Sequence, residues 1–156
     1  MNIHKIYAFF LLLVSTSIAF GQTTFDPTGT YVYKGRTIKK KGDTYGYLGT
    51  IQVQKVARTK IAMTFDICKG APSYNSGGFF DTLFYINNVS IFTTEIDSSC
   101  KITFNFDKKG IVVKEETADY NWGCGFGHAV IADGYFRKIS SKPPKLTMPG
   151  SGEEIK

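Results

Sequence analysis

The chain has 156 residues, of which 19 are basic and 13 acidic, and its formal net charge at pH 7 is +6. This length corresponds to one ordinary domain that can bury a core of its own. The excess of basic residues is mild, and no basic stripe interleaved with aromatic residues is present, which argues against a nucleic-acid-binding protein.

Residues 1–21 have the layout of a secretory signal peptide. Lys5 precedes an uncharged apolar run of about 15 residues, and Ala19 and Gly21 occupy the −3 and −1 positions of a cleavage site. The run is shorter than the ~20 residues that span a bilayer, so we expect cleavage rather than a stable membrane anchor. We therefore predict one domain over residues 22–141 that is periplasmic or secreted.

After residue 22 the sequence predicts an all-β domain. No segment sustains a helical period, and short segments rich in β-branched and aromatic residues alternate with Gly, Asn and Asp. Asn87-Asn88 tolerates positive φ and predicts a two-residue hairpin turn, and Asp133-Gly134 predicts a bulge in the last strand. We expect strands over residues 29–38, 47–56, 61–69, 79–86, 89–96, 100–106, 111–117 and 129–141.

Strands in this number and order favour a particular architecture. About eight antiparallel strands joined by short sequential connections close most naturally into an up-and-down β-barrel, because closure removes the exposed strand edges. A two-sheet sandwich is the alternative. Residues 142–156 contain paired prolines, glycines and charges, and we expect them to form a flexible C-terminal tail.

Three cysteines follow the signal peptide, so one disulfide could form in three ways. Cys100 opens a strand and Cys124 follows the next one, and these two ends lie side by side in an antiparallel pair. We prefer the Cys100–Cys124 bridge, which would close a loop of about 25 residues and contribute roughly 3 kcal/mol. Cys68 is then expected to be a buried thiol.

The inventory of reactive residues argues against an enzyme. His128 is the only imidazole outside the signal peptide, and no nucleophile lies beside it in a recognised motif. The cysteines do not have zinc-ligand spacing, and we interpret Glu95 and Asp97 as solvated turn charges. We therefore predict no catalytic residues, no metal and no cofactor, with a hydrolase acting through His128 as a minor alternative.

Two segments have the composition of recognition surfaces. The segment 70–78 is expected to be a longer loop, whose tyrosine, serine, asparagine and glycine content suits adaptable binding; its candidate residues are Ser73, Tyr74, Asn75 and Ser76. Trp122 would anchor in a pocket of a partner or close one end of the barrel. The basic cluster at residues 34–43 is interpreted as a solvated turn, with an anionic polymer or membrane surface as the alternative partner.

The C-terminal half carries a resemblance to a known group of proteins. The segment from Cys100, followed by CGFGHAVIADGYFRK at residues 124–138, resembles the small, lipocalin-like exported bacterial barrels related to the lysozyme-inhibitor families. The resemblance covers residues 98–139 and implies a disulfide-linked barrel that binds rather than catalyses. In the membrane-bound inhibitors a loop bearing Ser and Lys enters the enzyme cleft; segment 70–78 is the nearest counterpart but lacks the following Lys/Arg-Tyr.

These observations predict a non-enzymatic exported binding protein, of the inhibitor or immunity kind, that neutralises a cell-wall hydrolase or a toxin. A lipocalin-like carrier of a small apolar ligand is the alternative, because strand aromatics could line a cavity instead of filling it. Only Lys5 among the charged residues lies in the signal peptide, so 18 basic and 13 acidic residues leave the remainder at +5. That charge would repel a basic lysozyme.

Overall fold

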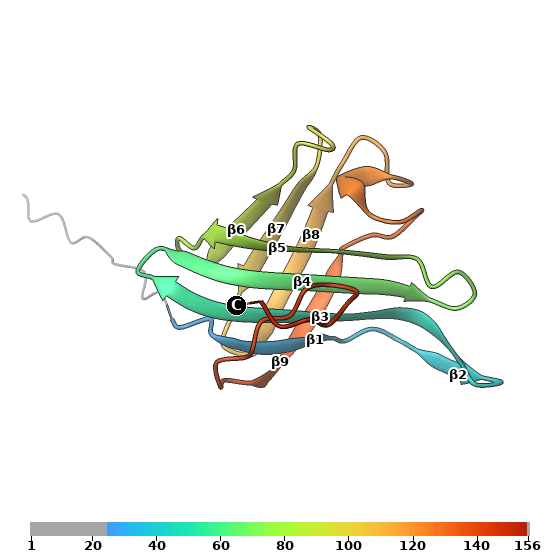
Figure 1. Ribbon diagram of the computed structural model, residues 1–156, viewed down its shortest axis with the longest axis horizontal. Helices are drawn as coiled ribbons and strands as arrows, with labels where there is room; N and C mark the ends of the chain where they lie inside the picture. The colour runs from blue at the N-terminus through green and yellow to red at the C-terminus, as the bar shows by residue number, and fades with distance from the viewer. Residues whose placement is uncertain (1–24, 156) are drawn as a thin grey trace, which may run out of the picture.

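The computed structural model describes residues 25–155 and confirms the all-β architecture (Figure 1). The predicted signal peptide lies outside the described residues. The chain forms nine strands and one short 3₁₀ turn, η1, which lies between the last two strands. Their bounds are β1 Gly29–Tyr33, β2 Ile38–Lys40, β3 Asp43–Ala57, β4 Lys60–Gly70, β5 Ser76–Phe84, β6 Val89–Thr93, β7 Lys101–Phe106, β8 Gly110–Glu116, η1 Gly123–Gly125 and β9 Gly134–Ser140.

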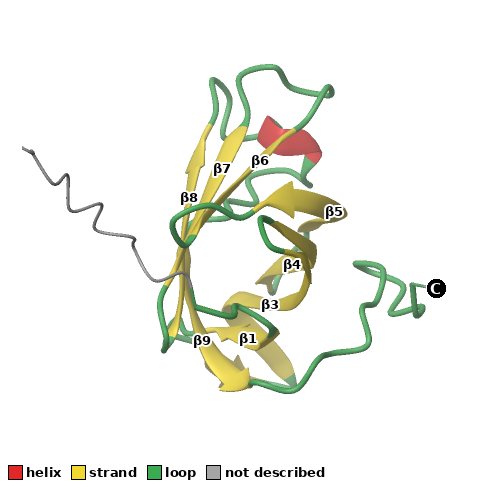
Figure 2. Ribbon diagram, turned by 90° about the vertical axis from the view of Figure 1, so that its left-hand side faces the viewer, coloured by secondary structure: helices red, strands yellow, loops and turns green. Residues whose placement is uncertain are grey.

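The strands form one antiparallel sheet that curls into a nearly closed barrel (Figure 2). The order across the sheet is β5-β4-β3-β1-β9-β8-β7-β6, and β2 pairs only with the start of β3. The first and last strands of the barrel, β1 and β9, therefore pair with each other. All the remaining ladders join strands that are consecutive along the chain, except that β1 pairs with β3 across the short strand β2. This is the predicted up-and-down topology rather than a two-sheet sandwich.

The barrel is not closed where a hairpin was expected. The Asn87-Asn88 turn forms as predicted, with φ values of 52° and 64°, and Ile86 and Val89 make one isolated bridge. Beyond that bridge, β5 and β6 diverge and form the two edges of the sheet. Side chains fill this seam instead: the rings of Phe79 and Phe92 stack with centroids 3.7 Å apart and planes 4° from parallel.

The expected first strand and turn also differ from the structure. Strand β1 ends at Tyr33, and residues 38–45 form a separate two-stranded ribbon that projects beyond the barrel (Figure 1). Its turn is Lys41-Gly42, whose φ values of 52° and 88° suit a two-residue hairpin. The predicted turn over 39–46 is therefore too long, because the positive φ at these two positions completes the reversal.

The strand predicted over 129–141 begins only at Gly134. Residues 129–133 (AVIAD) are mostly apolar and alternate in burial like a strand, but Ala129 has a φ of 54° and the segment joins no ladder. Side chains bind its backbone instead: the Glu115 carboxylate accepts the N–H of Ala132, and the Tyr47 hydroxyl accepts the N–H of Ile131.

Aromatic side chains fill the interior. Strand β7 alternates as predicted, with Ile102, Phe104 and Phe106 buried and the residues between them more exposed. The ring of Phe65 lies within 6.0 Å, centroid to centroid, of four other rings, those of Phe79, Phe104, Phe126 and Phe136. Rings in mutual contact at these spacings are packed as a core.

The C-terminal residues lie against the outside of the barrel, over β3 and β4 (Figure 2). Gln54 donates from its amide nitrogen to the Pro144 carbonyl oxygen, and Gln52 Oε1 accepts from both the amide and the hydroxyl of Thr147. Leu146 is buried at this contact. Polar side chains on the outer face of β3 therefore hold the segment that follows β9.

Candidate binding surface at the loop end

The connections of the barrel differ at its two ends because antiparallel strands place alternate connections together. One end, which we call the loop end, carries the β2–β3 ribbon, the β4–β5 turn at residues 71–75 and the longer connections 94–100 and 117–133. The other, which we call the turn end, carries the short connections at residues 58–59, 85–88 and 107–109.

The loop end brings together the two segments predicted to bind. Asn75 donates from Nδ2 to the carbonyl oxygen of His128 over 2.9 Å, and the Ser76 carbonyl oxygen accepts the Gly127 N–H over 2.9 Å. The ring of Trp122 lies 5.1 Å from that of His128, centroid to centroid. Asn75, Ser76 and Trp122 thus belong to one region, although more than 45 residues separate them along the chain.

The other predicted residues lie beside this contact, in a tighter segment than expected. The 70–78 loop shrinks to a turn, because the N–H of Tyr74 donates to the Gly70 carbonyl oxygen and Ser76 already belongs to β5. The Tyr74 hydroxyl donates to Asp43 Oδ1 over 2.6 Å, which ties the turn to the β2–β3 ribbon. Ser73 is exposed at the tip of the turn.

We define the loop-end surface as the half-buried Asn75 and the exposed side chains around its contact with His128. Trp122 is 63% exposed, and His128 and Tyr74 are exposed beside it. Sequence reasoning missed Ile96, which is also exposed and lies against Gly125 of the turn η1. An Ile in the run TTEIDSS has no local signal of exposure; only the position of the turn shows it. The surface comprises Tyr74, Asn75, Ile96, Trp122 and His128.

A disulfide and a carboxylate fix the turn that carries Trp122. Cys100 and Cys124 form the predicted bridge, with Cα atoms 5.0 Å apart, and it joins the start of β7 to η1. Asp97, interpreted from sequence as a solvated turn charge, instead accepts hydrogen bonds from Ser99, from the Thr117 hydroxyl over 2.8 Å and from the Cys124 N–H over 3.3 Å. These hydrogen bonds lower the pKa of Asp97 to about 2, and the bond from the Ser99 hydroxyl makes the largest contribution.

A second carboxyl group holds the other end of the same connection. Glu115 is buried, and its Oε2 accepts the Ala132 N–H over 2.6 Å, while Oε1 has no partner among the described residues. Burial raises the pKa of Glu115, and the nearby Asp133 and Asp97 raise it further. Asp133 in turn accepts the N–H of Glu115 and pairs with the Lys114 ammonium.

The remaining cysteine is partly exposed, so the prediction of a buried thiol is wrong. Cys68 follows the inward-facing Ile67 and therefore points outward, next to Leu48 and Ser76 on the neighbouring strands. Its sulfur accepts the N–H of Gly70 over 3.4 Å.

Within residues 25–155 the His128 imidazole makes no hydrogen bond to a serine, a cysteine or a carboxylate. No group of three or more His, Cys, Asp or Glu side chains in that range could hold a metal ion. No helix in the part of the chain that the structure describes is long and apolar enough to cross a membrane.

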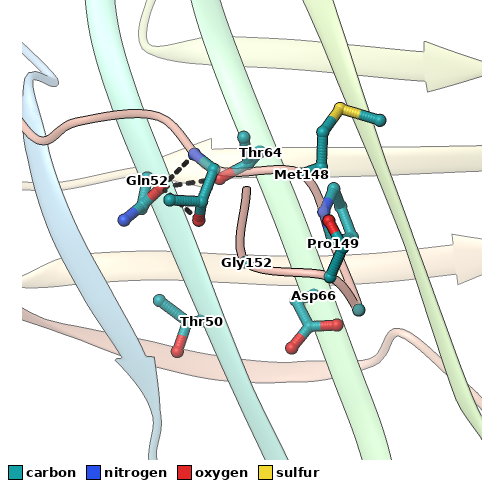
Figure 3. A pocket seen from close by; sticks show the side chains of 10 residues that line it. Thr50, Gln52, Thr64, Asp66, Met148, Pro149 and Gly152 are labelled. Atoms are coloured by element: carbon teal, nitrogen blue, oxygen red, sulfur yellow. Dashed lines mark hydrogen bonds between the residues drawn. The ribbon is translucent and has the colours of Figure 1, made fainter. Parts of the chain in front are cut away.

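A polar cleft of about 370 Å³ lies elsewhere, between the sheet and the C-terminal segment (Figure 3). Thr50, Gln52, Thr64 and Asp66 form its floor, and residues 147–152 its opposite wall. Burial raises the pKa of Asp66. The cleft offers hydrogen-bonding groups, but Gln52 Oε1 already accepts from Thr64 and Thr147, so this group holds the C-terminal segment against the sheet.

Comparison of the chain with family models, with curated proteins and with solved structures finds no match. The resemblance to lysozyme-inhibitor-related barrels therefore stays a prediction, and function has to be argued from the surface itself.

Proposed function

We propose that this chain is a non-enzymatic, exported binding protein that uses the loop-end surface to bind and neutralise a protein such as a cell-wall hydrolase or a toxin. The observation that carries the proposal is the hydrogen bond from Asn75 to the His128 carbonyl oxygen, which joins the two candidate segments. Export is supported by the disulfide, since such bonds persist in oxidising compartments.

Rigidity and composition both support this use of the surface. Interfaces derive most of their affinity from a few aromatic anchors, and Trp122 is exposed on a turn that the disulfide holds in place. Because the turn is ordered before a partner arrives, binding costs little conformational entropy there. A cleft or pocket of a partner could receive the Trp122 ring, with Tyr74 and Asn75 as polar contacts beside it.

The packed interior favours this proposal over the alternative of a carrier for a small apolar ligand. An apolar ligand would need the space that the rings of Phe65, Phe104 and Phe136 occupy. Without the signal peptide the chain has a net charge of +5. This charge attracts an acidic partner and repels a basic one.

Capture of a partner by matched variants tests the proposal. The wild-type protein, Trp122→Ala and Phe84→Ala are immobilised and exposed to periplasmic and culture fractions of the source cells. Phe84 is the matched control because it is 65% exposed, close to the 63% of Trp122, but lies at the turn end. We expect a partner that the wild type and Phe84→Ala retain and that Trp122→Ala binds at least about tenfold more weakly.

The identity of that partner completes the test. Addition of the purified protein to the captured hydrolase or toxin should abolish its activity, and Trp122→Ala should require at least about tenfold more protein for the same effect. Equal retention of the partner by all three proteins would move the binding site away from the loop end. A partner whose activity is unchanged when bound would refute neutralisation.

A further inference from the structure

The turn end has a feature that the proposed function does not use. A hollow of about 500 Å³ lies on the outer surface between the β7–β8 turn and β9. Its lining includes Lys108 and Lys109 from the turn, Arg137 from β9, and the Ser140 and Ser141 pair where β9 ends. The two walls come from segments that are distant along the chain, but the barrel fixes them side by side.

Backbone hydrogen bonds hold the walls in place. Asp107 accepts the N–H groups of Lys109 and Gly110 through Oδ1, which closes the turn, and the N–H of Lys138 donates to the Lys109 carbonyl oxygen over 2.8 Å. A Cβ on Gly110 would lie 2.6 Å from the hydroxyl oxygen of Tyr135, so the absence of a side chain there lets the Tyr135 ring lie over the strand. The hollow is therefore a built feature and not a gap between mobile loops.

The charged residues that line the hollow are all basic. Lys108, Lys109 and Arg137 are exposed, and none of them makes an ion pair with a described residue. A fourth cation, Lys138, also lines the hollow, but its ammonium is already engaged over the Tyr31 ring, 5.4 Å from the centroid.

The hollow itself is lined by no carboxylate, although Asp107 adjoins it in the β7–β8 turn. The nearest acid along the chain, Asp107, already binds two backbone N–H groups through one of its carboxylate oxygens. Three like charges that converge on one concavity raise the local potential, which concentrates small anions there.

The hydrogen-bonding groups indicate which anion fits. An Arg guanidinium offers a planar fork of donors that matches the oxygens of a phosphate, and Lys ammonium groups add point charges. Ser140 accepts the Lys142 N–H through its hydroxyl oxygen, which leaves its proton free to donate into the hollow. The volume exceeds that of one phosphate ion, so a phosphate group on a larger molecule suits it better.

We propose that the hollow at the turn end binds a phosphate group, carried by a soluble phosphate ester or by a phospholipid headgroup. The site lies at the end of the barrel opposite the loop-end surface, so the two could be occupied at once. Ile139 lies in the lining and is 57% exposed, which gives a lipid headgroup an apolar neighbour for its chains.

A charge-matched pair of variants tests the site. The first replaces the hollow's cations (Lys108→Gln, Lys109→Gln, Arg137→Gln), and the second removes three charges from the β2–β3 ribbon (Lys39→Gln, Lys40→Gln, Lys41→Gln). Both variants lose the same net charge, so a difference in their affinity for a probe shows that the position of the charges matters. The probes are inorganic phosphate and glycerol 3-phosphate, followed by amide NMR shifts, and sedimentation with phosphatidylglycerol or phosphatidylcholine vesicles.

We expect phosphate or glycerol 3-phosphate to shift the amide signals of residues 107–110 and 137–141. The hollow variant should weaken that binding at least about tenfold and the ribbon variant less than about threefold, because charge-assisted hydrogen bonds are lost only in the first. Binding to phosphatidylglycerol vesicles alone, lost in the hollow variant, would identify the headgroup as the source. Equal losses in both variants, or no binding to any probe, would overturn the proposal.

Discussion

The two ends of the barrel reach order by different physical means. At the turn end, connections of a few residues close through local backbone geometry and bonds between near neighbours, as in the positive φ of Asn87 and Asn88 and the bonds of Asp107 to Lys109 and Gly110. At the loop end, the connection from residue 117 to 133 is too long to be held that way. Backbone hydrogen bonds such as that from Gly127 to Ser76 are supplemented there by side chains: the Cys100–Cys124 disulfide fixes the connection, and the carboxyl groups of Asp97 and Glu115 bind its backbone. A long connection thus becomes a rigid platform when buried or paired side chains replace the missing ladder.

Of the changes that test this comparison of the two ends, removing the disulfide should have the largest effect on the free energy of unfolding. The double variant Cys100→Ala, Cys124→Ala frees the turn that carries Trp122, and we expect it to lose about 3 kcal/mol of unfolding free energy, since the bridge closes a loop of 24 residues. Urea unfolding at pH 7 measures the loss. Cys68→Ala is the control and should change stability by less than about 1 kcal/mol, because Cys68 forms no bridge. Equal stability of the three proteins would show that the loop end does not depend on the bridge.

Asp97 should make the loop end sensitive to acid. Its pKa is about 2 in the folded protein and near 4 in an unfolded chain, so its ionised form stabilises the fold above about pH 4. That contribution is lost as the pH falls from about 4 to about 2. In Asp97→Asn the unfolding free energy should be lower at neutral pH and should depend less on pH in this window. Acid titration of both proteins at a fixed urea concentration measures this. Curves of stability against pH that run parallel for the two proteins would contradict the role of Asp97.

Glu115 should act with the opposite sign and a smaller effect. Because its folded pKa is raised, its contribution to stability is present below the unfolded value near 4.3 and is lost as the pH rises through the folded pKa. Glu115→Gln keeps an oxygen that can accept the Ala132 N–H and carries no charge. We expect this variant to be more stable than the wild type at neutral pH and no more stable at pH 4, as measured by urea unfolding at both values.

The smallest expected effect compares one residue at each end. Ala129 at the loop end and Asn87 at the turn end both have positive φ, at 54° and 52°. Glycine relieves the left-handed conformation of Ala129 but gains little at Asn87, since Asn tolerates it. Ala129→Gly should raise the unfolding free energy by about 0.5 kcal/mol, and Asn87→Gly should leave it unchanged or lower it slightly. Thermal melts of the two variants and the wild type measure both changes. A larger gain in stability for Asn87→Gly than for Ala129→Gly would contradict the expectation.

The same contrast explains which features the sequence could predict. Local sequence patterns predict the turn end and most strands. The Asn87-Asn88 turn, the alternation in β7 and the strand ends that place Cys100 beside Cys124 all follow from residues that are neighbours in the sequence. The strand predicted over 129–133 is wrong for a different reason. This mostly apolar run leads into β9 as a strand would, but its backbone binds the side chains of Glu115 and Tyr47, which no local pattern indicates.

The candidate site was predicted residue by residue but not as a surface. Composition singled out Tyr74, Asn75 and Trp122 separately, and only the closing of the barrel places Asn75 against His128. The predicted hairpin between β5 and β6 failed for a related reason. The Asn-Asn turn is local, but whether two strands continue to pair depends on rings such as Phe79 and Phe92, which pack through space.

That seam gives the barrel an unequal response to temperature. Every other junction between neighbouring strands is a hydrogen-bonded ladder, whereas β5 and β6 meet mainly through the stacked rings of Phe79 and Phe92. Contacts between apolar groups weaken on cooling, because the hydrophobic effect near room temperature is driven by the entropy of water. We therefore expect the barrel to open first between β5 and β6 on cooling, while the hydrogen-bonded ladders persist.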